Sequence, residues 1–276
     1  MFSDLSRSLP IELFVGGIKT IIIDPHNHII PYWFWEFLQH RRRLVAVRID
    51  AHHDMFHCCP ALPAREGRDL HSFISGLMPC LQNYSREKVN EGNFSCPAFH
   101  YGALAALYHF HPRDNRIDSY GRVSGSEIID EPKTAERRAN PGEGKGRWIV
   151  WDENTIPLRG SSAKTIPVPE KITLNDFGRD MQDSILPTAV GFDLDGLYGN
   201  SDRGRPEDVI KKRLEAVRKV LERLGRPQFI CLARSQTPRS YIPETVVDRA
   251  QELALGLINE VYASSEELTY SCSLFE

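Results

Sequence analysis

Short apolar runs that end in polar clusters constrain the fold of this chain more than any other feature. Each run has the length of a strand, which predicts strands at residues 13–15, 20–23, 44–49, 148–151, 188–192 and 229–232. Amphipathic or alanine- and leucine-rich segments between the runs predict helices at 31–43, 97–110, 206–224 and 243–262. Strands that alternate with helices favour an α/β fold. We expect three layers, α/β/α, with a mostly parallel central sheet.

Composition narrows the class of protein. The chain has 276 residues, of which 41% are hydrophobic and 26% charged, so it can build a sizeable core. A net charge of −3 argues against a protein that binds nucleic acid regardless of sequence. No run approaches the roughly 20 apolar residues of a membrane span. The six cysteines form no CxxC pair and no secretory signal is evident, so we expect reduced thiols in a cytoplasmic protein.

The expected strand at 44–49 runs directly into Asp50-Ala51-His52-His53-Asp54. Side chains alternate along a strand, so Asp50 and His52 should share a side, which Asp54 joins if the chain stays extended. His53 should face the other way, where it either supports the ligands from behind or packs against other side chains. Parallel sheets bind ligands at the carboxyl ends of their strands, and these donors suit Mn, Fe, Co or Zn. A solvated turn with a capping aspartate is the alternative.

Two further expected strands end in groups of the same kind. Asp193-Leu194-Asp195 follows one of them, and two carboxylates held together repel unless a cation neutralises them. An Asp- and Gly-rich turn, or a phosphate or calcium loop, is the alternative there. His26 and His28 follow the other, and one of them can complete a ligand set, unless both only pack or cap. Arg48, within an apolar strand, has no evident partner in the sequence.

Taken together, these motifs resemble the signatures of the arginase and agmatinase superfamily. DAHHD is similar to its D-x-H-x-D signature and FDLDG to its second, D-x-D, signature. The stretches IDPHNHIIPYWFW, GNFSCPAFHYGALAALYHF and ICLARSQTP look like a branch that includes the peptide arginases. The resemblance covers most of the chain. Peptide arginases convert arginine side chains within a peptide to ornithine and release urea.

The resemblance implies one arginase-like catalytic domain over residues 1–276, with polar insertions near 114–147 and 158–169. It also implies two divalent ions, Mn²⁺ before Fe, Co or Zn. The matching positions are all filled here, by His26 (or, less readily, His28), Asp50, His52, Asp54, Asp193 and Asp195. Asp50 and Asp193 match the bridging carboxylates. Deacetylases of the same fold keep a reduced set for one zinc, so the full set favours two ions.

The resemblance also suggests the groups that act on the substrate. His71 lies in a Leu-His segment similar to the proposed proton shuttle of arginases, although a histidine at the start of an apolar helix is the alternative. Asp54 would accept a hydrogen bond from the nucleophilic water. Arginases hold the guanidinium with a glutamate on a late strand, but no acid stands at 231–236. The candidates to replace it are Asp152, Glu153 and Glu244.

The expected function is hydrolysis of a guanidinium C–N bond by a binuclear metal enzyme, acting on arginine or on an arginine side chain within a peptide. A metal-dependent amidohydrolase or deacylase of the same fold is one alternative, and a non-catalytic metal-binding module is another. We expect a small-molecule or peptide partner that carries a cationic guanidinium, with no nucleic acid and no membrane. The sequence leaves open whether the chain forms a homo-oligomer.

Overall fold

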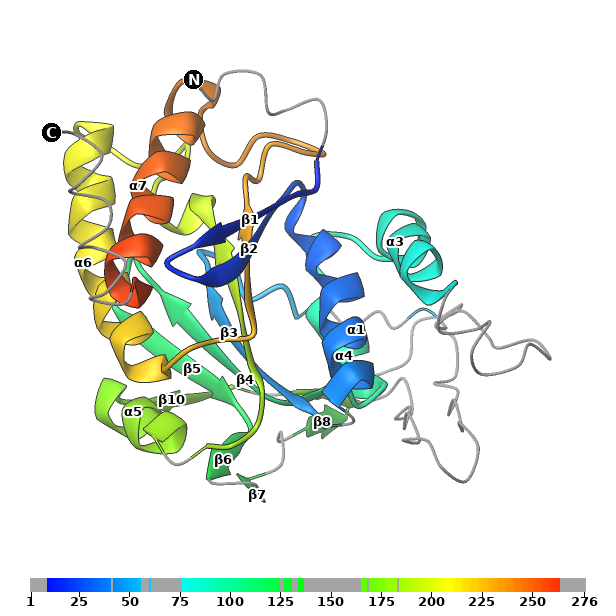
Figure 1. Ribbon diagram of the computed structural model, residues 1–276. Coiled ribbons are helices and arrows are strands. Elements are labelled where there is room, and N and C mark those ends of the chain that lie inside the picture. The colour runs from blue at the N-terminus through cyan, green and yellow to red at the C-terminus, as the bar shows by residue number, and fades with distance from the viewer. Residues whose placement is uncertain are drawn as a thin grey trace, which may run out of the picture.

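The computed structural model describes residues 9–40, 42–55, 60, 76–124, 127–130, 134–136, 165–167, 169–182 and 184–263. They form an α/β fold around an eight-stranded mixed sheet (Figure 1). Its strands, in spatial order, are β1 (Ile11–Val15), β2 (Ile18–Ile23), β12 (Phe229–Ala233), β11 (Thr188–Asp193), β3 (Leu44–Ile49), β4 (Leu104–His111), β5 (Arg116–Tyr120) and β10 (Glu170–Ile172). The five strands from β2 to β4 run parallel, and β1, β5 and β10 pair antiparallel at the two sides.

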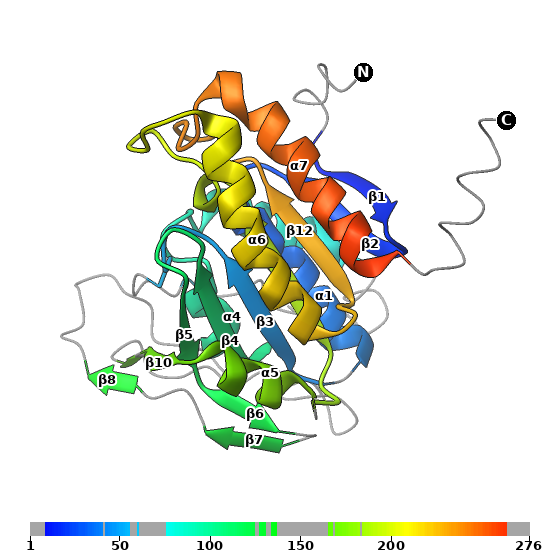
Figure 2. The ribbon, with the colours of Figure 1, turned by 90° about the vertical axis from the view of Figure 1, so that its left-hand side faces the viewer.

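Helices lie against both faces of this sheet. The short turn η2 (His26–Ile29), α1 (Ile30–His40), α3 (Leu77–Glu87) and α4 (Ser95–His100) lie on one face. On the other are α5 (Leu174–Gln182), α6 (Pro206–Leu224) and α7 (Glu244–Tyr262). Figure 2 shows α6 and α7 crossing in front of the sheet, with α1 behind it. Two ribbons, β6 (Arg122–Ser124) with β7 (Glu127–Asp130) and β8 (Thr134–Glu136) with β9 (Thr165–Pro167), pair outside the main sheet.

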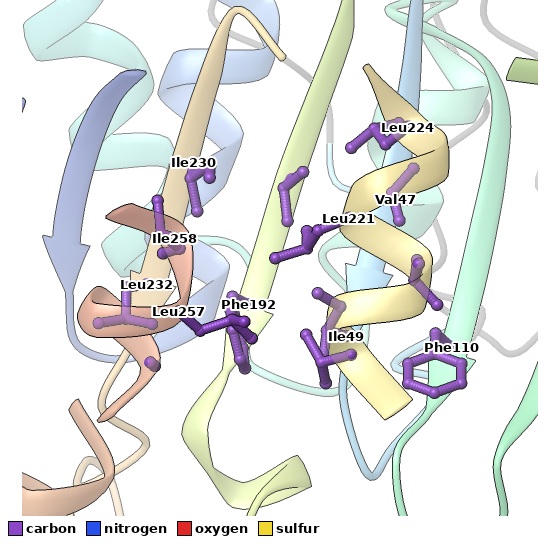
Figure 3. Close-up of a cluster of buried hydrophobic side chains, with 14 of the residues drawn as sticks. Val47, Ile49, Phe110, Phe192, Leu221, Leu224, Ile230, Leu232, Leu257 and Ile258 are labelled. Carbon is purple, nitrogen blue, oxygen red and sulfur yellow. The ribbon is translucent and has the colours of Figure 1, made fainter. Parts of the chain in front are cut away.

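The buried side chains divide between the two faces because successive residues of a strand point in opposite directions. In β3, Val45, Val47 and Ile49 pack with α6 and α7, whereas Leu44 and Ala46 pack with α1. Figure 3 shows Val47 and Ile49 on the same side of the sheet as Leu221 and Leu224 of α6. Arg48 follows the alternation of Ala46 and therefore lies on the α1 face, where it is 2% exposed.

Most of the predicted elements are confirmed. The strand predictions at 13–15, 20–23, 188–192 and 229–232 lie within observed strands, and that at 44–49 coincides with β3. The helix predicted at 206–224 coincides with α6, and those at 31–43 and 243–262 overlap α1 and α7. The strand predicted at 148–151 lies outside the described residues.

The helix predicted at 97–110 is wrong. Helix α4 ends at His100, Gly102 has a φ of 75°, and residues 104–111 form β4. Every residue of β4 is buried. A strand in the middle of a sheet that is covered on both faces needs no polar side, so its sequence lacks the alternation that marks a strand.

The polar stretch from residue 114 includes a strand of the main sheet. Arg116–Tyr120 forms β5, which pairs with β4 and β10, so this part is not an insertion outside the sheet. Residues 137–147 and 158–164 lie outside the described part of the chain. Among the described residues, no helix is long and apolar enough to cross a membrane. Cys80 and Cys231 are free thiols.

Candidate metal centre

The carboxyl ends of the parallel strands bring distant segments of the chain together. The register aligns Ile23 of β2 with Ala233 of β12, and Ala233 with Asp193 of β11. In the same way, Phe192 aligns with Ile49 of β3. The polar residues that follow each strand therefore meet at one edge of the sheet, which is where open α/β sheets bind ligands.

Two groups of potential ligands form at this edge and share one carboxylate. The first comprises His26, Asp50 and Asp193, and the second comprises Asp50, His52 and Asp195. In each group, one nitrogen or oxygen from each residue lies within 4.8 Å of the others. Asp50 therefore stands between the two groups, as a bridging ligand of two ions would. These buried His–Asp clusters can hold metal ions.

The first group is closed and tightly packed. Nδ1 of His26 contacts Oδ2 of Asp193 and lies 3.5 Å from Oδ2 of Asp50. Nε2 of the same ring lies 2.8 Å from the carbonyl oxygen of Glu91, which orients the ring. Asp50 and Asp193 are 1% and 2% exposed. Buried carboxylates at this spacing are stable only beside positive charge.

The second group opens towards solvent through its histidine. Nδ1 of His52 lies 2.9 Å from Oδ2 of Asp195 and 3.9 Å from Oδ1 of Asp50, and the His52 side chain is half exposed. Backbone amides hydrogen-bond both carboxylates: His52 N donates to Asp50 Oδ1 at 2.7 Å, and Ala51 N donates to Asp195 Oδ1 at 3.4 Å. The aspartates are therefore fixed, whereas the imidazole can meet a ligand from solvent.

Arg48, which has no evident partner in the sequence, contacts the carboxylates of the site. Its guanidinium contacts the carboxylate of Asp50 and, at 2.5 Å, that of Asp54. It lies 4.6 Å from the centroid of the Phe94 ring and donates to the carbonyl of His53 at 2.8 Å. Arg48 is thus a built-in cation of the carboxylate cluster.

Asp54 reaches the site by a different path from the predicted one. Its φ is 48°, so the chain leaves the extended conformation there. Even so, Oδ2 of Asp54 lies 3.4 Å from Nε2 of His26. The left-handed backbone, which aspartate tolerates better than most residues, turns the carboxylate back towards the first group.

The electrostatics of the centre reflect four carboxylates in a small buried volume. Burial, together with repulsion from neighbouring aspartates, raises the pKa of Asp54 and of Asp195 to about 6. Burial would also raise the pKa of Asp50, but Arg48 and His26 outweigh it and hold that pKa below its usual range. Despite burial, the carboxylates raise the pKa of His26 to about 10. The hydrogen bond to Asp195 is the largest cause that raises the pKa of His52, to about 9. The centre thus favours bound cations.

Residues that the sequence analysis did not single out support the ligands. Ser235 Oγ donates to Oδ1 of Asp193 at 2.5 Å, and Asp195 N donates to the same oxygen at 3.1 Å. The Tyr241 ring packs on His52 at 5.6 Å, and its hydroxyl donates to the Glu91 carboxylate at 3.2 Å. Ser235 lies two residues beyond the end of β12. The expectation that polar residues at the carboxyl ends of parallel strands form the site, which led to Asp193, therefore applies to Ser235 as well.

The remaining predicted site residues lie elsewhere. His28 is absent from both ligand groups and lines a separate cavity with Tyr32 and Arg86. Glu244 is exposed at the first residue of α7, and no described hydrogen bond or ion pair joins it to the ligand groups. His71, Asp152 and Glu153 lie outside the described residues. His53 points away from both groups, as predicted, into a cluster of its own.

Two comparisons with known proteins give no family for the chain. A scan against family models finds no match, and neither does a search of curated proteins. The chemistry of the site therefore rests on its own geometry.

Proposed function

We propose that this chain is a metal-dependent hydrolase of the arginase type, which binds two divalent ions, preferentially Mn²⁺, and cleaves a guanidinium C–N bond. The observation that carries the proposal is the sharing of Asp50 by two ligand groups, each with one histidine and one further aspartate. A single-ion site needs no such shared carboxylate. Two ions a few ångströms apart commonly share one.

The fold supports this proposal without deciding it. The five parallel strands at the centre and the helices on both faces suit the three-layer, mostly parallel arrangement of the arginase and deacetylase fold. The ligands follow strand ends in the order that the family resemblance implies. Folds host many activities, so the proposal depends on the site.

The donor set suits two hard or borderline divalent ions. Carboxylates supply most of the donors and each group adds one imidazole, a mixture that Mn²⁺ accepts. When bound, such ions acidify water and polarise the substrate. Asp193 is held for this task by Ser235, and His26 by the carbonyl of Glu91. Asp54, beside His26, is placed to accept a proton or a hydrogen bond at the edge of the first group.

We assign recognition of the cationic substrate to Glu91. Its carboxylate is held by the Tyr241 hydroxyl, and Tyr241 packs against the half-exposed His52. Its backbone carbonyl meets His26 of the first group. Glu91 is thus connected to both groups, and it can supply the negative charge that is missing at the end of β12. Glu244 has no such position.

The late strand favours a second candidate, a deacylase or amidohydrolase on the same site. Where arginases have a glutamate, residues 233–236 here are Ala-Arg-Ser-Gln. Arg234 turns away to Asp248 and Gln251, at 2.7 Å from each. An enzyme that cleaves an uncharged amide needs no acid at this position, so this candidate keeps the metal ions but releases no urea.

Product analysis separates these functions. Manganese-loaded protein is incubated with an arginine-containing peptide, free arginine and an acetyl-lysine peptide, and urea and acetate are measured. We expect urea, with ornithine in the peptide. Asp195→Asn should abolish it, whereas Asp202→Asn, in the same loop but outside both ligand groups, should retain it. Acetate without urea would support the deacylase. If neither urea nor acetate forms, both functions are refuted.

A further inference from the structure

A second cluster of potential ligands lies beside the proposed metal pair. His53, His109, His111 and Asp118 each offer one ligand atom, and these four atoms lie within 4.8 Å of one another. None of the four belongs to the groups that share Asp50. This cluster needs its own explanation, because the proposed hydrolase makes no use of it.

Three neighbouring segments build the cluster. His109 and His111 lie two residues apart on β4, so both point to the same face. Asp118 of β5 is the antiparallel partner of His109. His53 comes from the loop after β3, which is the parallel neighbour of β4. The strand pairing thus places three imidazoles and a carboxylate together at the end of the sheet.

The spacing of three of the four ligand atoms is close to that of ligands around zinc. His53 Nε2 lies 3.2 Å from His111 Nε2 and 3.2 Å from Asp118 Oδ2, and His111 Nε2 lies 3.0 Å from the same oxygen. His109 Nδ1 approaches the other nitrogen of His53 at 3.1 Å. Tetrahedral zinc, with Zn–N bonds of about 2.0–2.1 Å, holds its ligand atoms about 3.3 Å apart.

Hydrogen bonding alone does not account for this arrangement. His111 Nε2 faces His53 Nε2, the Asp118 carboxylate and Nη2 of Arg116, the last at 2.9 Å. If it carries a proton, it opposes the guanidinium, and if it does not, its lone pair opposes the carboxylate. In addition, Nε2 of the fully buried His109 has no hydrogen-bond partner among the residues that the structure describes. Buried polar atoms of this kind call for an explanation.

We propose that His53, His109, His111 and Asp118 bind a zinc ion that is separate from the proposed manganese pair. Four protein ligands make a closed, structural site rather than a catalytic one. Tyr120, whose hydroxyl lies 2.6 Å from His53 Nδ1, would fix the orientation of that ring, because a group that hydrogen-bonds the other nitrogen of a zinc-bound histidine holds its ring in place. Arg116 would leave His111 when zinc binds, since its side chain is one-third exposed and lies 3.9 Å from Asp114.

The zinc would hold the loop that supplies two of the proposed manganese ligands. His53 stands between His52 and Asp54, and its carbonyl accepts the hydrogen bond from Arg48. An ion on the His53 ring would tie this loop to β4 and β5. The loop would then keep its shape whether or not the neighbouring centre is filled.

Metal analysis of the full-length protein tests the proposal. After loading with manganese and zinc and removal of free metal, we expect one zinc equivalent beyond the pair. His111→Gln should lose that equivalent and keep the pair, whereas Asp50→Asn should lose the pair and keep the zinc. His28→Gln, a histidine outside both sites, should keep all of the metal. Equal zinc in wild type and His111→Gln would overturn the proposal.

Two measurements test the zinc site even if a variant of the cluster folds poorly. In Asp50→Asn, where the cluster is intact, cobalt should bind in place of zinc and give the intense visible bands of tetrahedral coordination. Arg116→Gln removes the competing guanidinium and should tighten zinc binding by roughly tenfold, as measured by competition with a chelator. If Asp50→Asn binds neither zinc nor cobalt, or if Arg116→Gln weakens zinc binding, the cluster is not a zinc site.

Discussion

Replacing Arg48 with methionine removes the cation that the chain itself supplies to its carboxylate cluster. Methionine keeps much of the apolar stem, so the loss is mainly that of the guanidinium, which contacts Asp50 and Asp54 in a site where Arg48 is 2% exposed. Removing one partner of a buried ion pair costs about 3–5 kcal/mol, because the remaining charge stays buried without compensation. For a chain of this size, the melting temperature should fall by about 10 °C.

Divalent ions should reverse much of this loss. Each ion held at about 100 times its dissociation constant stabilises the folded state by about 2.7 kcal/mol. In the variant, the ions no longer compete with a guanidinium for Asp50 and Asp54. The rise in melting temperature on adding Mn²⁺ should therefore be larger for Arg48→Met than for the wild type.

Thermal unfolding in EDTA and in Mn²⁺, followed by circular dichroism, measures both effects. Arg179→Met is the matched control, since Arg179 pairs with Asp176 at the surface and its side chain is 67% exposed. This control should change little in either condition. The reasoning is refuted if Arg48→Met melts within about 2 °C of the wild type in EDTA, or if Mn²⁺ stabilises both proteins equally.

Three further substitutions probe separate parts of the account. Ser235→Ala removes the hydroxyl that orients Asp193 and should weaken Mn²⁺ binding by about tenfold in a chelator titration; unchanged affinity would show that the hydroxyl is dispensable. The paired Arg213 guanidinium lowers the pKa of Asp202. Asp202→Asn should therefore cost about 1 kcal/mol in urea unfolding at pH 7. Above a pH of about 5 the unfolded chain has released this proton, so the cost should be constant there. It should then vanish as the pH falls through the lower folded-state pKa, and a constant cost down to pH 2 would contradict this. Gly256→Ala, on the exposed side of α7 with open space around it, should stabilise the protein by about 0.5–1 kcal/mol, and destabilisation would show a hidden contact.

Much of the sheet and the grouping of site residues could be predicted because the signals are local. The run from Leu44 to Ile49 is apolar except for Arg48 and ends at a charge, so both the strand and the position of Asp50 follow from composition. The parallel neighbours then bring Asp193 and His26 to the same edge. The grouping of these residues needs only strand ends and parallel pairing, both of which the pattern predicts.

Other features depend on tertiary context that no local pattern carries. Strand β4 was predicted as a helix because a strand covered on both faces looks like any apolar segment. The role of Arg48 depends on a left-handed turn that brings Asp54 back to it. The cluster around His53 forms only because β5 pairs with β4, within a stretch that its charges and glycines made look like an insertion.

Metal content of the full-length protein tests the central claim most directly. Wild-type protein loaded with Mn²⁺ and freed of excess metal should hold two manganese ions per chain, and Asp50→Asn should lose both, because the two ligand groups share Asp50. Loss of a single ion from Asp50→Asn would mean that the groups are independent. A wild-type protein that holds one manganese ion or none would contradict the two-ion account.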